Sequence, residues 1–209
     1  MDIKKIKNFL YYNWLKIAIF VFAAVFCVVT LMQCSQRSET DLGIMYVGKA
    51  VASKNLPLLA EEIKKSCYLA DADGDGKISL NTKTITIGEN KQEMIVQQVP
   101  EQIQVEIISG ENLLYILDKS ILISYSVDQS FADITDLALK YNIPRDNCLT
   151  YENGAVYAIS AEGTKILEDF GVESKGMYFA LRNYLEKDKN NPLNINAKKS
   201  FEFILERNK

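Results

Sequence analysis

The sequence of 209 residues contains no histidine, and this absence excludes several classes of catalytic site. A Ser-His-Asp triad and a Cys-His nucleophile pair both need an imidazole base. The HExxH zinc site and any histidine general base are excluded for the same reason. Chemistry would have to use carboxylates, lysine, tyrosine or a carboxylate-bound metal, so the composition favours a protein that is not an enzyme.

Several short motifs are also missing from the chain. It has no GxGxxG, Walker A, GxSxG or CxxC sequence, so roles in phosphate binding or redox chemistry have no support. The net charge is −3 but is unevenly divided: residues 1–34 carry four lysines and one acid, and the rest of the chain carries 20 basic and 26 acidic residues. The remainder is acidic, which argues against nucleic acid as a partner, because phosphate binding needs a basic face.

Cysteine is sparse, with four residues at positions 27, 34, 67 and 148, and their spacing does not fit a metal site. Cys67 and Cys148 lie in the part of the chain that follows the apolar run described next. Outside the cell they could form a disulfide, and otherwise they would be two buried thiols. The sequence leaves both alternatives open.

One long apolar run is present near the N-terminus. Residues 17–32 read IAIFVFAAVFCVVTLM without a single charge. As a helix this run spans ~24 Å, and the apolar and aromatic residues before it extend the length toward the ~30 Å of a bilayer core. Tyr11, Tyr12 and Trp14 are typical of a membrane interface. The pattern predicts a transmembrane helix over residues 17–33 after a basic segment, 1–16.

The distribution of charge predicts the orientation of this helix. Lys4, Lys5, Lys7 and Lys16 precede the run, so the N-terminus is expected in the cytoplasm and the remainder outside the cell. A cleaved signal peptide is one alternative, although the region near Gln33 lacks the preferred small residues. A lipoprotein with Cys34 as the lipidated residue is another. All three alternatives place the rest of the chain on the same side of the membrane.

Residues 34–40 predict a short polar tether, and residues 41–209 predict an extracytoplasmic α/β domain. Apolar or β-branched runs at 42–47, 82–88, 112–117, 155–160 and 177–181 are typical of buried strands. Helical patterns lie at 56–68, 91–109, 134–141, 165–170 and at the C-terminus, where Asn194 or Asn196 is the expected cap. This alternation predicts a mostly parallel sheet flanked by helices.

Three segments resemble extracellular solute-binding proteins. DLGIMYVG, which follows the apolar run, is similar to their first strand, and EQIQVEIISGENLLYILDKSIL is similar to a helix–Gly–strand passage. FADITDLALKYNI resembles the short helix that comes next. Members of the family have two lobes, whereas this domain has room for one. The resemblance therefore implies a small, membrane-anchored, single-lobe relative of the kind found in Gram-positive-type bacteria.

An acidic stretch, Asp71-Ala-Asp-Gly-Asp-Gly-Lys-Ile-Ser79, matches the first half of a calcium-binding loop. The candidate ligands are Asp71, Asp73, Asp75, Lys77 through its carbonyl group, and Ser79. The bidentate glutamate of such loops falls at Thr82, so the loop would lose two ligand oxygens. The sequence predicts either a solvated acidic turn or a weak structural calcium site, and no other cofactor.

A second candidate site follows from the expected topology. In open α/β sheets ligands bind beyond the carboxyl ends of the strands. Tyr46 and Gly48 end the first expected strand, and Asp118 and Lys119 follow the third, so these four residues could line one cleft. Tyrosines are frequent in the domain, and they could also contact sugars or a protein partner, although tyrosines with this distribution often belong to the core.

These patterns favour a membrane-tethered, non-enzymatic binding or interaction module outside the cell. Its expected partners are the lipid bilayer, through residues 17–33, and a membrane protein complex or a small ligand. One alternative is an accessory solute-binding protein that presents a ligand to a transporter. Another is a carboxylate-based enzyme acting on envelope glycans, which would need two acids across a cleft.

Overall fold

The computed structural model describes residues 11–16, 18–26, 28, 40–48, 55–86, 98–109, 112–126, 130–184, 188 and 190–207. The chain divides into two compact units, residues 1–39 and residues 40–209. Each unit is described below by itself.

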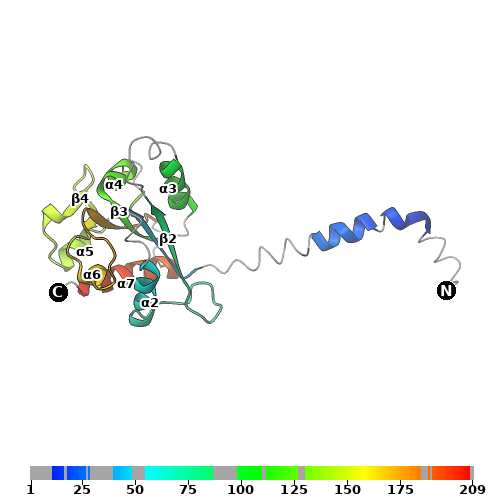
Figure 1. Ribbon diagram of the computed structural model, residues 1–209, viewed down its shortest axis with the longest axis horizontal. Coiled ribbons are helices and arrows are strands. Elements are labelled where there is room, and N and C mark those ends of the chain that lie inside the picture. The colour runs from blue at the N-terminus through cyan, green and yellow to red at the C-terminus, as the bar shows by residue number, and fades with distance from the viewer. Residues whose placement is uncertain are drawn as a thin grey trace. The chain divides into compact units, whose positions relative to one another are not determined.

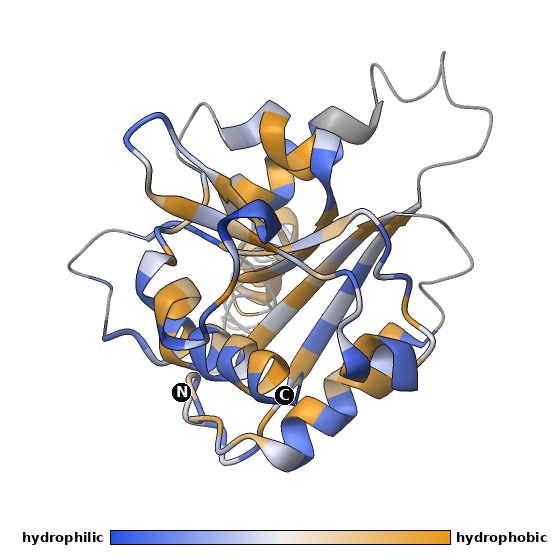
Figure 2. Cartoon of the chain, turned by 90° about the vertical axis from the view of Figure 1, so that its left-hand side faces the viewer, coloured by the Kyte–Doolittle hydropathy of each residue, from blue (hydrophilic) through white to orange (hydrophobic). Residues whose placement is uncertain are grey.

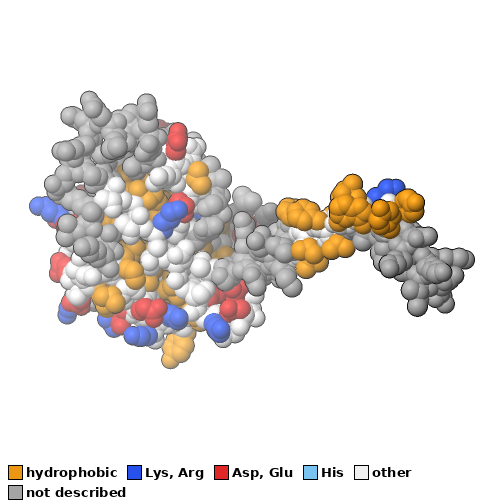
Figure 3. All heavy atoms as spheres, turned by 45° about the vertical axis from the view of Figure 1, so that its right-hand side comes forward, with side chains coloured by type: hydrophobic (Ala, Val, Ile, Leu, Met, Phe, Trp, Pro, Cys, Tyr) orange, Lys and Arg blue, Asp and Glu red, His pale blue; other side chains and the backbone are white. Residues whose placement is uncertain are grey.

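In the first unit, residues 11–16 and 18–26 are helical. Their large apolar side chains are exposed, among them Trp14, Phe20 and Phe22 at 65%, 76% and 73% (Figure 3). None of the helices in the described residues has the length and apolar character that crossing a bilayer requires. Of the predicted span, residues 17, 27 and 29–33 lie outside the described residues.

The second unit is an α/β sandwich (Figure 1). Its strands are β1 (Leu42–Gly48), β2 (Leu80–Thr86), β3 (Leu114–Asp118), β4 (Cys148–Thr150), β5 (Val156–Ser160) and β6 (Met177–Leu181). Its helices are α2 (Leu56–Ser66), α3 (Gln98–Ser109), α4 (Lys119–Ser126), α5 (Thr135–Lys140), α6 (Lys165–Asp169) and α7 (Pro192–Glu206), with a 3₁₀ turn, η2, at Arg145–Asn147. All five predicted strands are confirmed: 177–181 coincides with β6, and the other four have ends shifted by one or two residues.

The six strands form one mixed sheet in the order β2-β1-β3-β6-β5-β4. Strand β1 pairs in parallel with β2 and β3, whereas the β3–β6, β6–β5 and β5–β4 pairs are antiparallel. The prediction of a mostly parallel sheet was therefore wrong. A parallel neighbour needs a crossover that carries the chain back along the whole strand. Strand β2 returns alongside β1 after helix α2, whereas β6 lies between β3 and β5 and runs antiparallel to both.

Helices cover both faces of the sheet, which explains why its central strands are apolar at every position. In β1, Leu42, Ile44 and Tyr46 face a core that includes α2, α5, α6 and α7. Met45 and Val47 face the smaller core under α3 and α4. Figure 1 shows these two helical layers on opposite sides of the sheet, and in Figure 2 the apolar sides of the helices turn toward the strands.

Three features were not predicted correctly. Strand β4 forms a hairpin with β5 through a turn at Asn153-Gly154, where Gly154 has φ of 84°. Helix α4 follows β3 directly and is capped by Asp118, whose carboxylate accepts from the Ser120 N–H at 2.9 Å. Helix α7 begins at Pro192 with Asn191 as its cap, so neither Asn194 nor Asn196, the two expected caps, was correct.

The sequence left two alternatives open for the cysteines, and the structure shows that Cys67 and Cys148 are free thiols.

The two margins of the sheet have different structures. Strand β2 forms one margin and is polar at five of its seven positions, with Lys83 at its middle. Lys83 pairs with the buried carboxylate of Glu106 on α3, which also accepts from the Asn112 amide. Strand β4 forms the other margin, has three residues, and changes register between Leu149 and Thr150.

Candidate functional site

The predicted cleft residues lie at the carboxyl ends of β1 and β3, which are adjacent parallel strands. Tyr46 is fully buried, and its ring lies so close to Gly48 that a Cβ there would be 2.6 Å from the hydroxyl oxygen. Gly48 thus leaves room for the tyrosine ring. Asp118 caps α4, and Lys119 begins that helix at the same edge of the sheet.

The Tyr46 hydroxyl is unusual because it is buried and has no hydrogen-bond partner among the residues that the structure describes. Burial raises its pKa to about 12, and the nearby carboxylates of Glu173 and Asp118 contribute to the same shift. The hydroxyl therefore stays protonated near neutral pH and could donate one hydrogen bond. An unpaired buried hydroxyl costs about 1–3 kcal/mol, so it is a feature that needs an explanation.

The acidic loop between α2 and β2 brings three carboxylates together. One ligand oxygen from each of Asp41, Asp71 and Asp73 lies within 4.8 Å of the others. Asp41 immediately precedes β1, and the Leu42–Leu80 pairing places it against the end of the loop. Its carboxylate accepts from the N–H groups of Ala72 and Ser79, at 2.6 and 2.7 Å.

The predicted calcium ligands are arranged in part as expected. Asp71 accepts from the N–H groups of Gly74 and Gly76, both at 2.7 Å. Asp73 lies beside it, whereas Asp75 accepts from the Lys77 N–H and is outside the group of three. Sequence reasoning missed Asp41, because it lies thirty residues before the loop and only strand pairing brings it near. Thr82, at the glutamate position, lies in β2.

Electrostatics within the loop favour a cation. The Gly76 N–H, followed by other hydrogen bonds, lowers the pKa of Asp71 below its ordinary value. The pKa of Asp73 is raised above its ordinary value. The hydrogen bond from the Asp75 N–H acts to lower it, but this effect is outweighed by partial desolvation, by the hydrogen bond to Asp71 and by the neighbouring carboxylates. A divalent cation would relieve this repulsion, and three carboxylates are hard oxygen ligands suited to Ca²⁺.

Calcium at 10 mM should raise the melting temperature by about 4 °C, as expected for one site with a Kd of about 1 mM. Asp73→Ala should abolish the shift because it removes one of the three converging carboxylates. Asp75→Ala is the matched control and should retain it. Thermal unfolding followed by circular dichroism measures all three proteins. A wild-type melting temperature that calcium does not change would identify the loop as a turn alone.

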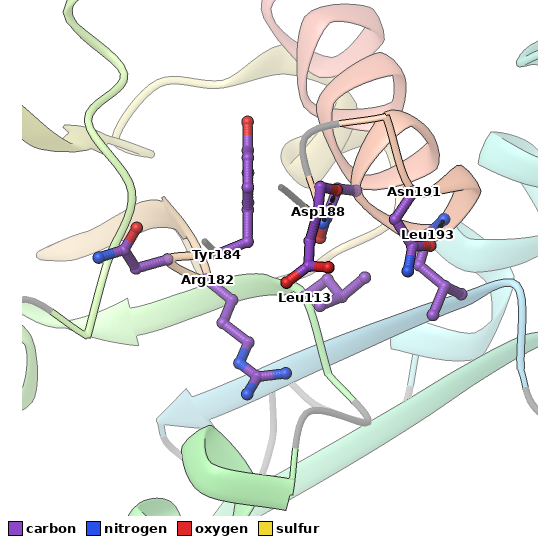
Figure 4. Close-up of a pocket in the computed structure, with 8 residues that line it drawn as sticks. Leu113, Arg182, Tyr184, Asp188, Asn191 and Leu193 are labelled. Carbon is purple, nitrogen blue, oxygen red and sulfur yellow. Dashed lines mark hydrogen bonds between the residues drawn. The ribbon is translucent and has the colours of Figure 1, made fainter. Parts of the chain in front are cut away.

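A pocket of about 280 Å³ lies at the opposite ends of the strands from the predicted cleft. It is found where β3 begins and β6 ends, beneath the start of α7 (Figure 4). Its lining contains none of the four predicted cleft residues. The lining residues are Leu113, Arg182, Asn183, Tyr184, Asp188, Asn191, Leu193 and Asn194. Sequence reasoning missed this site because its residues lie in loops and caps that are close only in the folded chain.

The backbone around the pocket is held by hydrogen bonds. The Arg182 N–H donates to the Leu113 carbonyl at 2.9 Å, and the Leu113 N–H donates to the Gly43 carbonyl at 3.0 Å. On the other side, the Asn191 side chain caps α7 by accepting from the Leu193 N–H at 3.0 Å. The pocket is thus built on the ends of fixed elements.

Comparison with known proteins gave no match to any family model, curated protein or solved structure.

Proposed function

We propose that this chain is a membrane-tethered binding or interaction module, not an enzyme, with residues 40–209 outside the cell. The observation that carries the proposal is the surface of the first unit. Its described helical residues expose apolar and aromatic side chains on all sides, including Tyr12, Ile19 and Val25 at 80%, 62% and 56%. Such a surface is unfavourable in water and is typical of a helix in contact with lipid.

The sequence supports the same proposal. The uncharged run 17–32 is contained in the proposed anchor at residues 17–33, and Lys16 directly before the run can extend toward the headgroups. Four lysines precede the run, which favours a cytoplasmic N-terminus. The second unit has its own two cores and forms a separate compact body. This organisation suits a binding domain that is held at a membrane surface by a short tether.

Two measurements on the full-length protein in cells test the anchor. After carbonate washing we expect the protein in the membrane pellet, whereas Val21→Asp combined with Val25→Asp should release most of it, because each buried charge costs about 3 kcal/mol. The matched control is Leu58→Asp with Leu139→Asp, two exposed apolar residues of the second unit. Release of the unaltered protein by carbonate would refute the anchor.

The orientation is tested by cysteine labelling in intact cells. In a background in which the four native cysteines are replaced by serine, Tyr68→Cys places a single thiol at a position that is 94% exposed in the second unit, and a membrane-impermeant maleimide should label it. Asn8→Cys should become labelled only after lysis. Labelling in the reverse pattern would show that the domain is cytoplasmic.

An accessory solute-binding protein is the second candidate. The specific observation in its favour is the Tyr46 hydroxyl, which has no partner in the described part of the chain and lies at the carboxyl ends of β1 and β3, where open α/β sheets bind ligands. This alternative predicts permease genes beside the gene for this chain. An interaction module instead predicts co-purification with a membrane partner.

A further inference from the structure

We propose that the pocket between β3, β6 and the start of α7 binds a neutral pyranose sugar. The proposal goes beyond a general binding role and does not depend on the membrane anchor. It rests on the arrangement of polar groups around the cavity and on the position of one aromatic ring.

The pocket combines hydrogen-bond acceptors with donors. Asp188 is held through its backbone, because its carbonyl accepts from the Asn194 amide at 2.8 Å. Its carboxylate has no hydrogen-bond or ion-pair partner among the described residues and lies at the centre of the lining residues (Figure 4). The Asn191 side-chain oxygen is used in capping α7, which leaves the amide N–H groups of Asn191 available as donors.

Tyr184 forms one wall of the pocket. Figure 4 shows its ring edge-on, with one face turned toward Asp188 and Asn191. The Arg182 side chain extends in the opposite direction from Tyr184, so the guanidinium is not placed between the ring and the carboxylate. A ligand lying against the ring would therefore meet the Asp188 and Asn191 side chains at its edge.

A sugar ring fits these features better than an ion does. Each hydroxyl of a pyranose both donates and accepts, so it can use a carboxylate and an amide donor together. The apolar C–H groups on one face of the ring can pack against an aromatic side chain. A phosphate or carboxylate ligand would be repelled by Asp188, and an ammonium group, which has donors only, could not use the Asn191 amide N–H groups.

Binding is measured on the full-length chain in a detergent without a sugar headgroup, because a glycosidic detergent would compete for the site. The probes are methyl glucopyranoside, methyl galactopyranoside and N-acetylglucosamine, and the readout is isothermal titration calorimetry with saturation-transfer NMR. At least one probe should bind with a Kd on the order of 1 mM, a value typical of a small ligand with few contacts.

Variants localise the binding to the pocket. Asp188→Ala and Tyr184→Ala should each weaken binding roughly tenfold, which corresponds to the loss of one good contact. The controls carry the same substitutions elsewhere: Asp136→Ala, on the exposed side of α5, and Tyr68→Ala should bind as the unaltered protein does. Tyr184 and Asp188 are half-buried, so circular dichroism and thermal unfolding check that both pocket variants remain folded.

Three results would overturn the proposal. The first is that none of the three sugars binds, and the second is that binding is unchanged in both pocket variants. The third is that spermidine or inorganic phosphate binds at the pocket in place of the sugars, which would make it an ion site. The cysteine-labelling and carbonate experiments are independent of all three, so failure here would leave the proposed anchor and orientation unaffected.

Discussion

Asn196→Ala should lower the free energy of unfolding by about 3 kcal/mol, the largest loss that we expect from one side chain outside the apolar core. Asn196 is fully buried in α7 and joins three parts of the chain. Its oxygen accepts from the Ala70 N–H at 2.8 Å, and its nitrogen donates to the carbonyls of Ala70 and Asp41, at 2.7 and 3.0 Å. Alanine would leave all three backbone groups without this partner.

The measurement is thermal and urea unfolding of the full-length protein, and the melting temperature should fall by about 10 °C. The matched control is Asn194→Ala, two residues earlier in the same helix. Asn194 is half-exposed, and within the described part of the chain its side chain makes one hydrogen bond, to the Asp188 carbonyl, so its loss should cost no more than about 1 kcal/mol. Equal effects of the two substitutions would contradict the proposed role of Asn196.

Gly48→Ala should destabilise the protein by about 2–3 kcal/mol through overpacking. The added Cβ would lie 2.6, 2.7 and 2.8 Å from the Oη, Cε1 and Cζ atoms of Tyr46. The tyrosine ring is fully buried between the sheet and its helices, so it cannot move aside without disturbing the core. The expected cause is therefore a steric clash and not backbone strain.

A double-mutant cycle separates the clash from other effects. Tyr46→Leu alone should destabilise, because it leaves a cavity, but Gly48→Ala should cost much less in that background. Chemical denaturation of the four proteins gives the coupling energy, which should exceed about 1 kcal/mol. A cost of Gly48→Ala that is the same in both backgrounds would show that the tyrosine ring is not the obstacle.

The class of the fold could be predicted because the strands that are buried on both faces carry an unbroken apolar pattern. Residues 42–47 and 112–117 have this pattern, and the structure confirms helices on both sides of the sheet. Strand direction could not be predicted, because it depends on which strands become neighbours in the folded sheet. Strand β6 lies between β3 and β5 and runs antiparallel to both, and a residue pattern does not reveal this arrangement.

The candidate sites were predictable only where their residues are close in sequence. The acidic loop is visible as a motif, but Asp41 joins it through the pairing of β1 with β2. The signal that could have led to Asp41 is its place just before a buried strand, where an acid with no partner would be costly. The pocket at Tyr184 and Asp188 depends on the arrangement of β3, β6 and α7, so no local pattern predicts it.

The structure of the sheet margins has a consequence for the behaviour of this protein at high concentration. An unpaired strand can add a strand from a neighbouring copy and so begin aggregation. Here one margin carries a lysine that is committed to Glu106, and the other is three residues long with an irregular register. Both margins are therefore poor templates for another chain, so copies of the protein are expected to remain separate molecules at high concentration.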